Sequence, residues 1–331
     1  MTEQTAQSTA EQINERGVQA HLDGNLEQAL NCYRQAVEQA PENATYLNNL
    51  GFLLATKGQW DDATLYLRQA ISQSPEHSMA HSNLGQTLFA QGEIQEGLVL
   101  LEKSVQLDPG NLQAWDNLGR LRLVTGDATG SESAYRQACQ IETNNSHRLT
   151  GLGTAIAAQN RLQEAIQVLQ AAIELDGNNA KAWSQLGGVL FMYKDFGSAR
   201  QALQQALTLN ETDHLARRHL ALLHSTCGER DAALEEFETI VSTAPEDDVS
   251  RLDLAVLLLS AEKSKQARPH LEQLYTKTPD DERVRFYYGV SLVNSGARKK
   301  GEKILAPLTN NPTSQFGKEA QQIIEKHNQP Q

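Results

Sequence analysis

The sequence predicts an all-α solenoid of about nine tandem 34-residue helix-turn-helix repeats, followed by a C-terminal capping helix. Three sets of residues return with a 34-residue period and support this prediction. Glycine recurs at Gly51, Gly85, Gly119, Gly153 and Gly187. Alanine recurs in a second register, at Ala29, Ala63, Ala165, Ala199, Ala233 and Ala267. Proline recurs in a third, at Pro41, Pro75, Pro109, Pro245 and Pro279.

The units follow one another without insertion or deletion. Residues 1–9 are rich in Thr, Gln and Ser and are expected to be disordered. Residues 10–247 form regular repeats one to seven, and residues 248–312 form divergent repeats eight and nine. The units begin at residues 10, 44, 78, 112, 146, 180, 214, 248 and 282. Within each unit, a pattern such as that of residues 47–75 indicates two amphipathic helices, a glycine turn and a closing proline.

Each recurring residue type has a packing role. Small residues at unit positions 8 and 20 allow two helices to cross closely, and a larger side chain there would wedge them apart. Leucine or aromatic residues at positions 7 and 24 fill the space between helices, and each contributes about 1.5–3 kcal/mol when fully buried. Glycine near position 15 permits the turn, and proline at position 32 ends the second helix.

The C-terminal part departs from the pattern. Pro307 is expected to kink or shorten the second helix of repeat nine. Residues 313–331 are expected to form a capping helix and tail, because apolar residues there fall on one helical face, namely Phe316, Ala320, Ile323 and Ile324. Such a helix would close the last hydrophobic layer.

Several segments match a known repeat. Trp115-x2-Leu118-Gly119 and Trp183-x2-Leu186-Gly187 match the first half of the tetratricopeptide pattern. Ala29-x3-Tyr33 and Ala233-x3-Phe237 match its second half. The chain thus resembles a tetratricopeptide repeat (TPR) protein over nearly its whole length. The resemblance implies a right-handed superhelix whose concave groove is lined by the first helix of each unit, mainly at positions 2, 5, 6, 9, 12 and 13.

Composition and motifs exclude several functions. A net charge of −12 argues against nucleic acid as the main ligand. The three dispersed cysteines, a polar N-terminus and the lack of a long apolar run indicate a cytoplasmic protein without a membrane span. No enzyme motif is present. The strongest metal candidates cannot converge from one helix, so neither a metal nor a cofactor is expected; these candidates are His214, His219, His224 and Cys227.

The predicted groove begins with a polar half. Its candidate peptide-binding residues are Asn48, Asn49, Asn83, Gln86, Asn117, Arg120 and Gln185. A column of primary amides can bracket an extended peptide backbone through its donors and acceptors. It resembles the asparagine ladder in the repeat arm of O-linked N-acetylglucosamine transferases, whose catalytic domain has no counterpart here. The alternative is that Asn-Leu-Gly is only repeat consensus and forms a hydrated surface.

The other end of the predicted groove is apolar. Its candidate interface residues are Val249, Leu252, Val256, Leu259, Phe286, Tyr287 and Val290. A helix that is apolar all round is usually covered all round. The cover could be a partner's amphipathic helix, a second copy of the chain in a homo-oligomer, or the chain's own C-terminal helix. Alternatively, the end repeats are merely atypical.

The sequence therefore predicts a non-catalytic scaffold or adaptor that binds a peptide or partner helix in its concave groove. One alternative is an accessory subunit that recruits substrates for a separately encoded enzyme such as a glycosyltransferase. Another is an assembly or pilotage factor for a secretion or surface-polymer system. Such a factor would make weak peripheral contact with a membrane through Arg298, Lys299, Lys300 and Lys303.

Overall fold

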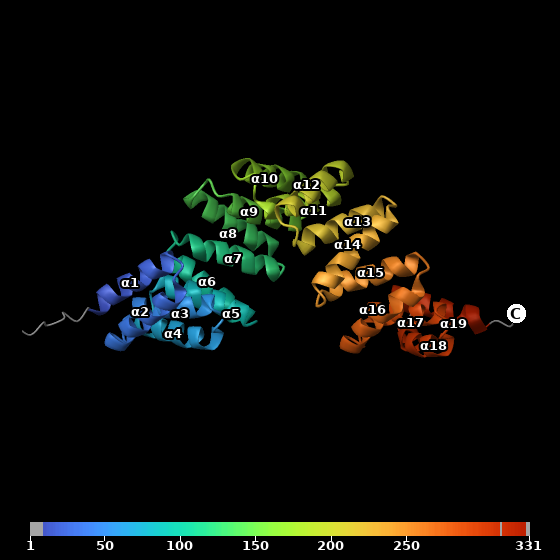
Figure 1. Ribbon diagram of the computed structural model, residues 1–331, viewed down its shortest axis with the longest axis horizontal. Helices are drawn as coiled ribbons and strands as arrows, with labels where there is room; N and C mark the ends of the chain where they lie inside the picture. The colour runs from blue at the N-terminus through green and yellow to red at the C-terminus, as the bar shows by residue number, and fades with distance from the viewer. Residues whose placement is uncertain (1–8, 312, 329–331) are drawn as a thin grey trace, which may run out of the picture. The chain divides into compact units, whose positions relative to one another are not determined.

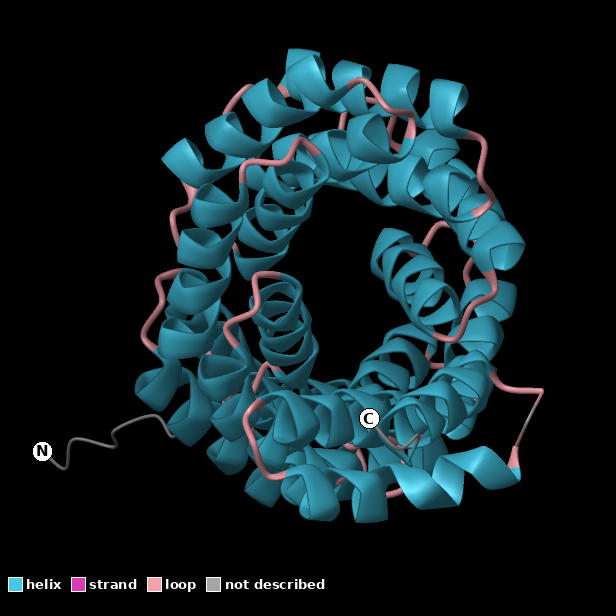
Figure 2. Ribbon diagram, turned by 90° about the vertical axis from the view of Figure 1, so that its right-hand side faces the viewer, coloured by secondary structure: helices cyan, strands magenta, loops and turns pink. Residues whose placement is uncertain are grey.

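The computed structural model describes residues 9–311 and 313–328, which form helices joined by short connections, with no strand in these two ranges (Figures 1 and 2). The predicted all-α repeat fold is confirmed. The chain divides into two compact units, Met1–Ala182 and Trp183–Gln331. The disorder expected for residues 1–9 lies outside the described residues except at Thr9, whose side chain caps the first helix.

In the first unit, 13-residue and 14-residue helices alternate, and each pair forms one repeat. Helices that are consecutive in the chain pack against each other, as do alternate first helices such as α3 and α5. The helices of this unit are α1 (Ala10–Leu22), α2 (Leu26–Gln39), α3 (Ala44–Thr56), α4 (Trp60–Gln73), α5 (Ser78–Ala90), α6 (Ile94–Leu107), α7 (Leu112–Val124), α8 (Ala128–Ile141), α9 (Ser146–Ala158) and α10 (Leu162–Leu175).

The second unit continues the same alternation, and α11 (Ala180–Met192) runs across the boundary between the units. Its further helices are α12 (Phe196–Leu209), α13 (His214–Thr226), α14 (Arg230–Thr243), α15 (Asp248–Ser260), α16 (Ser264–Lys277), α17 (Glu282–Asn294), α18 (Arg298–Leu305) and α19 (Gln315–Asn328). A short 3-10 helix, η1 (Ala306–Asn310), precedes α19. The first helix of every repeat begins at the residue given by the 34-residue period.

An Asn or Asp at unit position 34 fixes most of these starts. The side chains of Asn43 and Asn111 accept hydrogen bonds from backbone N–H groups in the first turns of α3 and α7. Asp213 and Asp281 do the same for α13 and α17. Such caps satisfy N–H groups that have no partner inside the helix. This column was not predicted from the sequence.

The turn between the two helices of a repeat needs a left-handed residue. At position 15, Gly58 and Gly126 have φ values of 74° and 84°. Asn160, Lys194 and Glu262 occupy the same position in other repeats and also have positive φ, between 60° and 67°. The backbone of this turn is therefore kept even where glycine is lost.

Glycine at position 8 permits close helix crossing. A Cβ added at Gly85 would lie 2.9 Å from the backbone oxygen of Gly97, and one added at Gly97 would lie 2.8 Å from that of Gly85. The α5 and α6 backbones are thus in contact. Leucines that fill the surrounding space, such as Leu84 and Leu101, are almost fully buried.

The end of the second unit differs from the other repeats. Helix α18 has 8 residues because Pro307 cannot continue an α-helix, and the chain passes into η1. Helix α19 then packs its apolar face on the last repeat. The cluster joins Phe286, Leu305 and Leu308 to residues of α19, namely Phe316, Ala320, Ile323 and Ile324.

Candidate functional site

Two neighbouring hollows in the first unit are lined mainly by the first helices of repeats one to four. The first hollow, of about 320 Å³, is lined by Val18, His21, Leu22, Tyr33, Asn48, Asn49, Phe52, Met79, Asn83 and Gln113. The second, of about 400 Å³, is lined by Phe52, Ala55, Thr56, Trp60, Asn83, Gln86, Thr87, Ala90 and Gln113. The two hollows are neighbours, because Phe52, Asn83 and Gln113 line both of them. We call these two hollows the N-terminal groove.

A row of hydrogen-bonded amides crosses this groove. The Asn49 Nδ2 donates to Asn14 Oδ1 at 3.1 Å, and the Asn48 Nδ2 donates to Asn49 Oδ1 at 3.4 Å. The Asn83 Nδ2 donates to Asn48 Oδ1 at 2.8 Å, and the Gln113 Nε2 donates to Asn83 Oδ1 at 3.4 Å. The row therefore runs through α1, α3, α5 and α7. Asn14 and Gln113 were not predicted, although they occupy groove positions 5 and 2 of their units.

The amides differ in accessibility. Asn48 and Asn83 are only 6% and 4% exposed, whereas Asn49 and Gln113 are half-buried. A primary amide can donate two hydrogen bonds and accept two. Since each of the contacts above uses one of these, Asn49 and Gln113 keep bonding capacity where a ligand can reach it. Asn48 and Asn83 mainly position their neighbours.

Gln86, Asn117 and Arg120 form a second polar set. The Asn117 Nδ2 donates to Gln86 Oε1 at 3.2 Å, and the Arg120 guanidinium donates to Asn117 Oδ1 at 2.9 Å. The guanidinium also lies 6.0 Å from the centre of the Phe89 ring. These contacts hold Arg120, which is exposed, at the edge of a further hollow of about 310 Å³.

Paired charges line that further hollow. The Arg148 Nε donates to both Asp116 carboxylate oxygens at 3.0 Å, and an Arg148 terminal nitrogen lies 2.8 Å from Glu142. Burial raises the pKa of Asp116 although Arg148 favours its ionised form. Burial, assisted by Asp116, raises the pKa of Tyr135 to about 12. The remaining predicted polar residue, Gln185, lies half-buried on α11 in the second unit.

The apolar residues predicted for repeats eight and nine are largely covered. Leu252 and Phe286 are buried. Phe316 of α19 lies with its ring centre 5.3 Å from that of Phe286 and 6.1 Å from that of Tyr287, and Val290 packs in the same cluster. The chain's own C-terminal helix thus covers the repeat-nine part of this surface. It is one of the three possible covers that the sequence left open.

Part of the repeat-eight surface is open. Val249 is 55% exposed, whereas Val256 and Leu259 are half-buried against the core of the second unit. A partner or self-association surface at these residues stays a prediction.

Large apolar side chains are also open in the N-terminal groove. Leu22, Met79, Val18 and Trp60 are exposed on its walls. The Phe52 ring stacks on His21 with centres 5.6 Å apart. Met79, Val18 and Leu22 occupy unit positions 2, 9 and 13, so the family's groove positions could have identified these three. The site predicted for these repeats contained only amides and Arg120.

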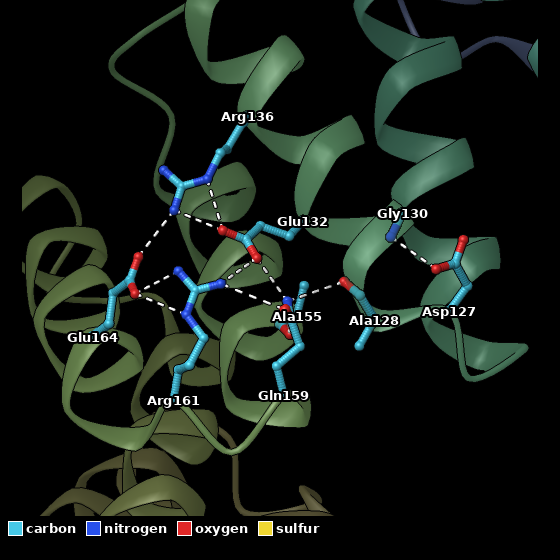
Figure 3. Close-up of polar contacts among 9 residues, drawn as sticks. All are labelled: Asp127, Ala128, Gly130, Glu132, Arg136, Ala155, Gln159, Arg161 and Glu164. Atoms are coloured by element: carbon cyan, nitrogen blue, oxygen red, sulfur yellow. Dashed lines mark hydrogen bonds and ion pairs between the residues drawn. The ribbon is translucent and has the colours of Figure 1, made fainter.

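A dense group of charged side chains lies outside the groove, between repeats four and five (Figure 3). Glu132 accepts from Gln159 at 2.7 Å, Arg161 at 2.6 Å and Arg136 at 2.8 Å. Both arginines also contact Glu164. Every charge in the group is paired, and the group connects α8, α9 and α10, which indicates a role in joining the two repeats.

We expect Glu132→Gln to lower the free energy of unfolding by about 1 kcal/mol at pH 7. Burial opposes ionisation of Glu132, but the hydrogen bonds from Gln159, Arg136 and Arg161 together outweigh it and lower the pKa of this carboxyl. A lowered folded-state pKa stabilises the fold above the unfolded-state pKa of about 4.3, and the effect is lost as the pH falls through the folded-state value. Urea unfolding at several pH values measures the difference.

The exposed Glu174 provides the matched control, because Glu174→Gln removes the same charge outside the group. A difference between Glu132→Gln and the unchanged chain that did not shrink as the pH fell below the unfolded-state pKa of about 4.3 would contradict this account.

Other candidate chemistry is limited. Within residues 9–311 and 313–328, no group of three or more His, Cys, Asp or Glu side chains is placed to hold a metal ion. His224 pairs with Glu229. The part of the chain that the structure describes also contains no helix with the length and apolarity required to cross a membrane.

Known proteins resemble the chain in sequence and fold. The family described as Cilia and flagella-associated protein 70 C-terminal domain matches residues 1–222. No curated protein matches the chain. Among solved structures, the APC/C hetero-tetramer Cut9–Hcn1 matches with a TM-score of 0.65 at 19% identity. That match covers 81% of this chain and 52% of the other, so the chain spans about half the length of that relative.

Two further structures show the same fold. A tetratricopeptide repeat protein from Parabacteroides merdae matches with a TM-score of 0.61 at 15% identity, covering 75% of this chain and 98% of the other. A thermophilic tetratricopeptide protein from Thermus thermophilus matches with a TM-score of 0.51 at 25% identity, covering 55% and 99%. The chain is a tetratricopeptide repeat protein and belongs to the family described as Cilia and flagella-associated protein 70 C-terminal domain.

Proposed function

We propose that this protein is a non-catalytic scaffold that holds an extended segment of a partner protein in its N-terminal groove. Proteins with tetratricopeptide repeats bind protein or peptide partners. The observation that carries the proposal is the amide row, whose members Asn49 and Gln113 line the groove and are accessible there. This is the chemistry that an extended backbone requires.

An extended segment fits better than a helix. A helix satisfies its own backbone N–H and C=O groups, so only its side chains would reach the amides. An extended chain presents free donors and acceptors, and Asn49 and Gln113 offer both kinds of group. The residues that line the two hollows include no Asp, Glu, Lys or Arg, although 21% of the chain is charged. Recognition by backbone contacts rather than by charge follows from this lining.

A random linear dodecapeptide library displayed on phage, selected on the full chain, supplies the test. We expect enriched peptides whose affinity falls about tenfold or more when Asn49→Ala and Gln113→Ala are combined, since each hydrogen bond contributes about 0.5–1.5 kcal/mol. Titration of a labelled peptide by fluorescence anisotropy measures the affinity.

The control pair is Gln106→Ala with Gln140→Ala, because these two residues are exposed on α6 and α8 outside the groove. The proposal fails if no enriched peptide binds the free protein. The control pair should leave the affinity unchanged. The proposal also fails if the combined Asn49→Ala and Gln113→Ala changes leave it unchanged.

A cytoplasmic site of action is part of the proposal. Cys32, Cys139 and Cys227 are unpaired, and a fold held by packing without disulfides suits a reducing compartment. Cell fractionation with a thiol-reactive label on the native protein checks both points. Recovery of the protein from an oxidising compartment would contradict the location.

A further inference from the structure

The first hollow of the N-terminal groove has an apolar wall beside the amides. Leu22 is 76% exposed, and Met79 and Val18 are about 40% exposed. Phe52 lies between the two hollows and is held by its stack on His21. Large apolar side chains gathered in a hollow on a protein surface mark an interaction site.

The same hollow contains polar groups that an apolar ligand alone would not satisfy. Asn49 and Gln113 line it, and covering them without new hydrogen bonds would cost the free energy of desolvating two amides. A lipid chain would leave them unpaired, and so would a partner helix. An extended peptide places an apolar side chain and backbone polar groups side by side.

The geometry points to a partner segment with one bulky apolar side chain, namely leucine, methionine or an aromatic residue, which binds among Val18, Leu22, Phe52 and Met79. The backbone on either side of that residue runs along Asn49 and Gln113. This inference rests on the proposed function and adds the chemical class of the residue that anchors the segment.

The size and charge of the hollow agree with a single neutral anchor. Its volume of about 320 Å³ lies at the lower end of the range of about 300–1,000 Å³ seen for ligand pockets, so it can hold one bulky side chain with part of the adjoining backbone. Its lining includes no Asp, Glu, Lys or Arg side chain that would pair with an acidic or basic side chain of the peptide. A charged anchor would be desolvated there without a partner.

An apolar anchor also accounts for affinity. Two or three amide contacts supply only a few kcal/mol, whereas micromolar binding needs about 8 kcal/mol. The apolar contribution was predicted for repeats eight and nine, but α19 covers the repeat-nine part of that surface. The open apolar side chains of repeats one to three lie next to the amides and can act on the same peptide.

The test uses a peptide selected on the full chain and variants at two exposed apolar residues. We expect Leu22→Asp to weaken binding at least tenfold, because it puts a charge beside the anchor. Val99→Asp, at a residue 64% exposed on α6 and outside the groove, should leave binding unchanged. Replacing the peptide's apolar anchor by serine should weaken binding to the unchanged protein similarly and add little to the effect of Leu22→Asp.

The outcomes separate this inference from the proposed function. If Leu22→Asp binds normally while the Asn49 and Gln113 pair still weakens binding, the apolar anchor is wrong and the peptide groove stands. A peptide that becomes helical on binding, with apolar residues every three or four positions, also overturns the inference. If no selected peptide binds, both ideas fail. Far-UV circular dichroism verifies that Leu22→Asp is folded.

Discussion

Removing residues 311–331 is expected to unfold the last repeat and to make the protein self-associate. Without α19, the cluster around Phe286, Leu305 and Leu308 would face water. The buried Ala320 and the half-buried apolar residues of α19, which are Phe316, Ile323 and Ile324, would be lost. A fully buried large side chain contributes roughly 1.5–3 kcal/mol, and a half-buried one contributes about half of that. The free energy of unfolding of the last repeat should therefore fall by about 4 kcal/mol.

The loss should be local, since each repeat of a solenoid contacts only its neighbours. Hydrogen exchange measured by mass spectrometry should show lost protection in α17 and α18 and unchanged protection in α3 to α6. Light scattering should show species larger than a monomer, because the newly exposed apolar surface can associate.

A full-length variant provides a second route to the same result. A Cβ added at Gly317 would lie 2.1 Å from the backbone oxygen of Asn311, so Gly317→Leu should displace α19. Gln321→Ala, at an exposed position of α19, should have no effect. Unchanged protection of α17 in both the truncated chain and Gly317→Leu would show that α19 does not cap the array.

Gly85→Val is expected to lower the free energy of unfolding of the first unit by about 3 kcal/mol. The added side chain would meet the backbone oxygen of Gly97 at 2.9 Å and the side chain of Leu101 at 2.9 Å. Leu101 could turn aside, but the backbone of α6 cannot move without separating α5 from α6. Hydrogen exchange of α5 and α6 in urea measures the change where it arises.

Gly177→Ala is the matched control for Gly85→Val. Its nearest neighbour, the backbone oxygen of Ile173, lies 4.0 Å from the added Cβ, so the change should stay within about 0.5 kcal/mol. Equal protection of α5 in Gly85→Val and Gly177→Ala would contradict the close crossing of the two helices.

Periodic features of the fold could be predicted from the sequence. The recurrence of small residues located the helix crossings, and the 34-residue period gave the first residue of every repeat. A glycine turn near unit position 15 was predicted, but the same turn at Asn160, Lys194 and Glu262 was not. Those three residues adopt positive φ because the flanking helices impose it. Pro307 correctly indicated a shortened helix in repeat nine.

The candidate site was harder to predict because it depends on contacts between repeats. The asparagine column was identified, but its internal hydrogen bonds were not. The Asn83 side chain can either face a ligand or bond to Asn48. The distance between the two helices decides which of these it does, and here it bonds to Asn48. Likewise, Phe286 and Leu22 are both apolar residues on first helices. Phe286 is covered by α19 and Leu22 is open, and no local sequence pattern distinguishes the two residues.

Binding in the N-terminal groove is the central claim, and the methyl signal of Met79 tests it most directly. The chain has three methionines, and Met79 lines the first hollow whereas Met192 is exposed in the second unit. In protein labelled with 13C at the methionine methyl groups, titration with a selected peptide should shift the Met79 signal progressively and leave that of Met192 unchanged. Saturable peptide binding with an unmoved Met79 signal would contradict the claim and place the peptide elsewhere on the protein.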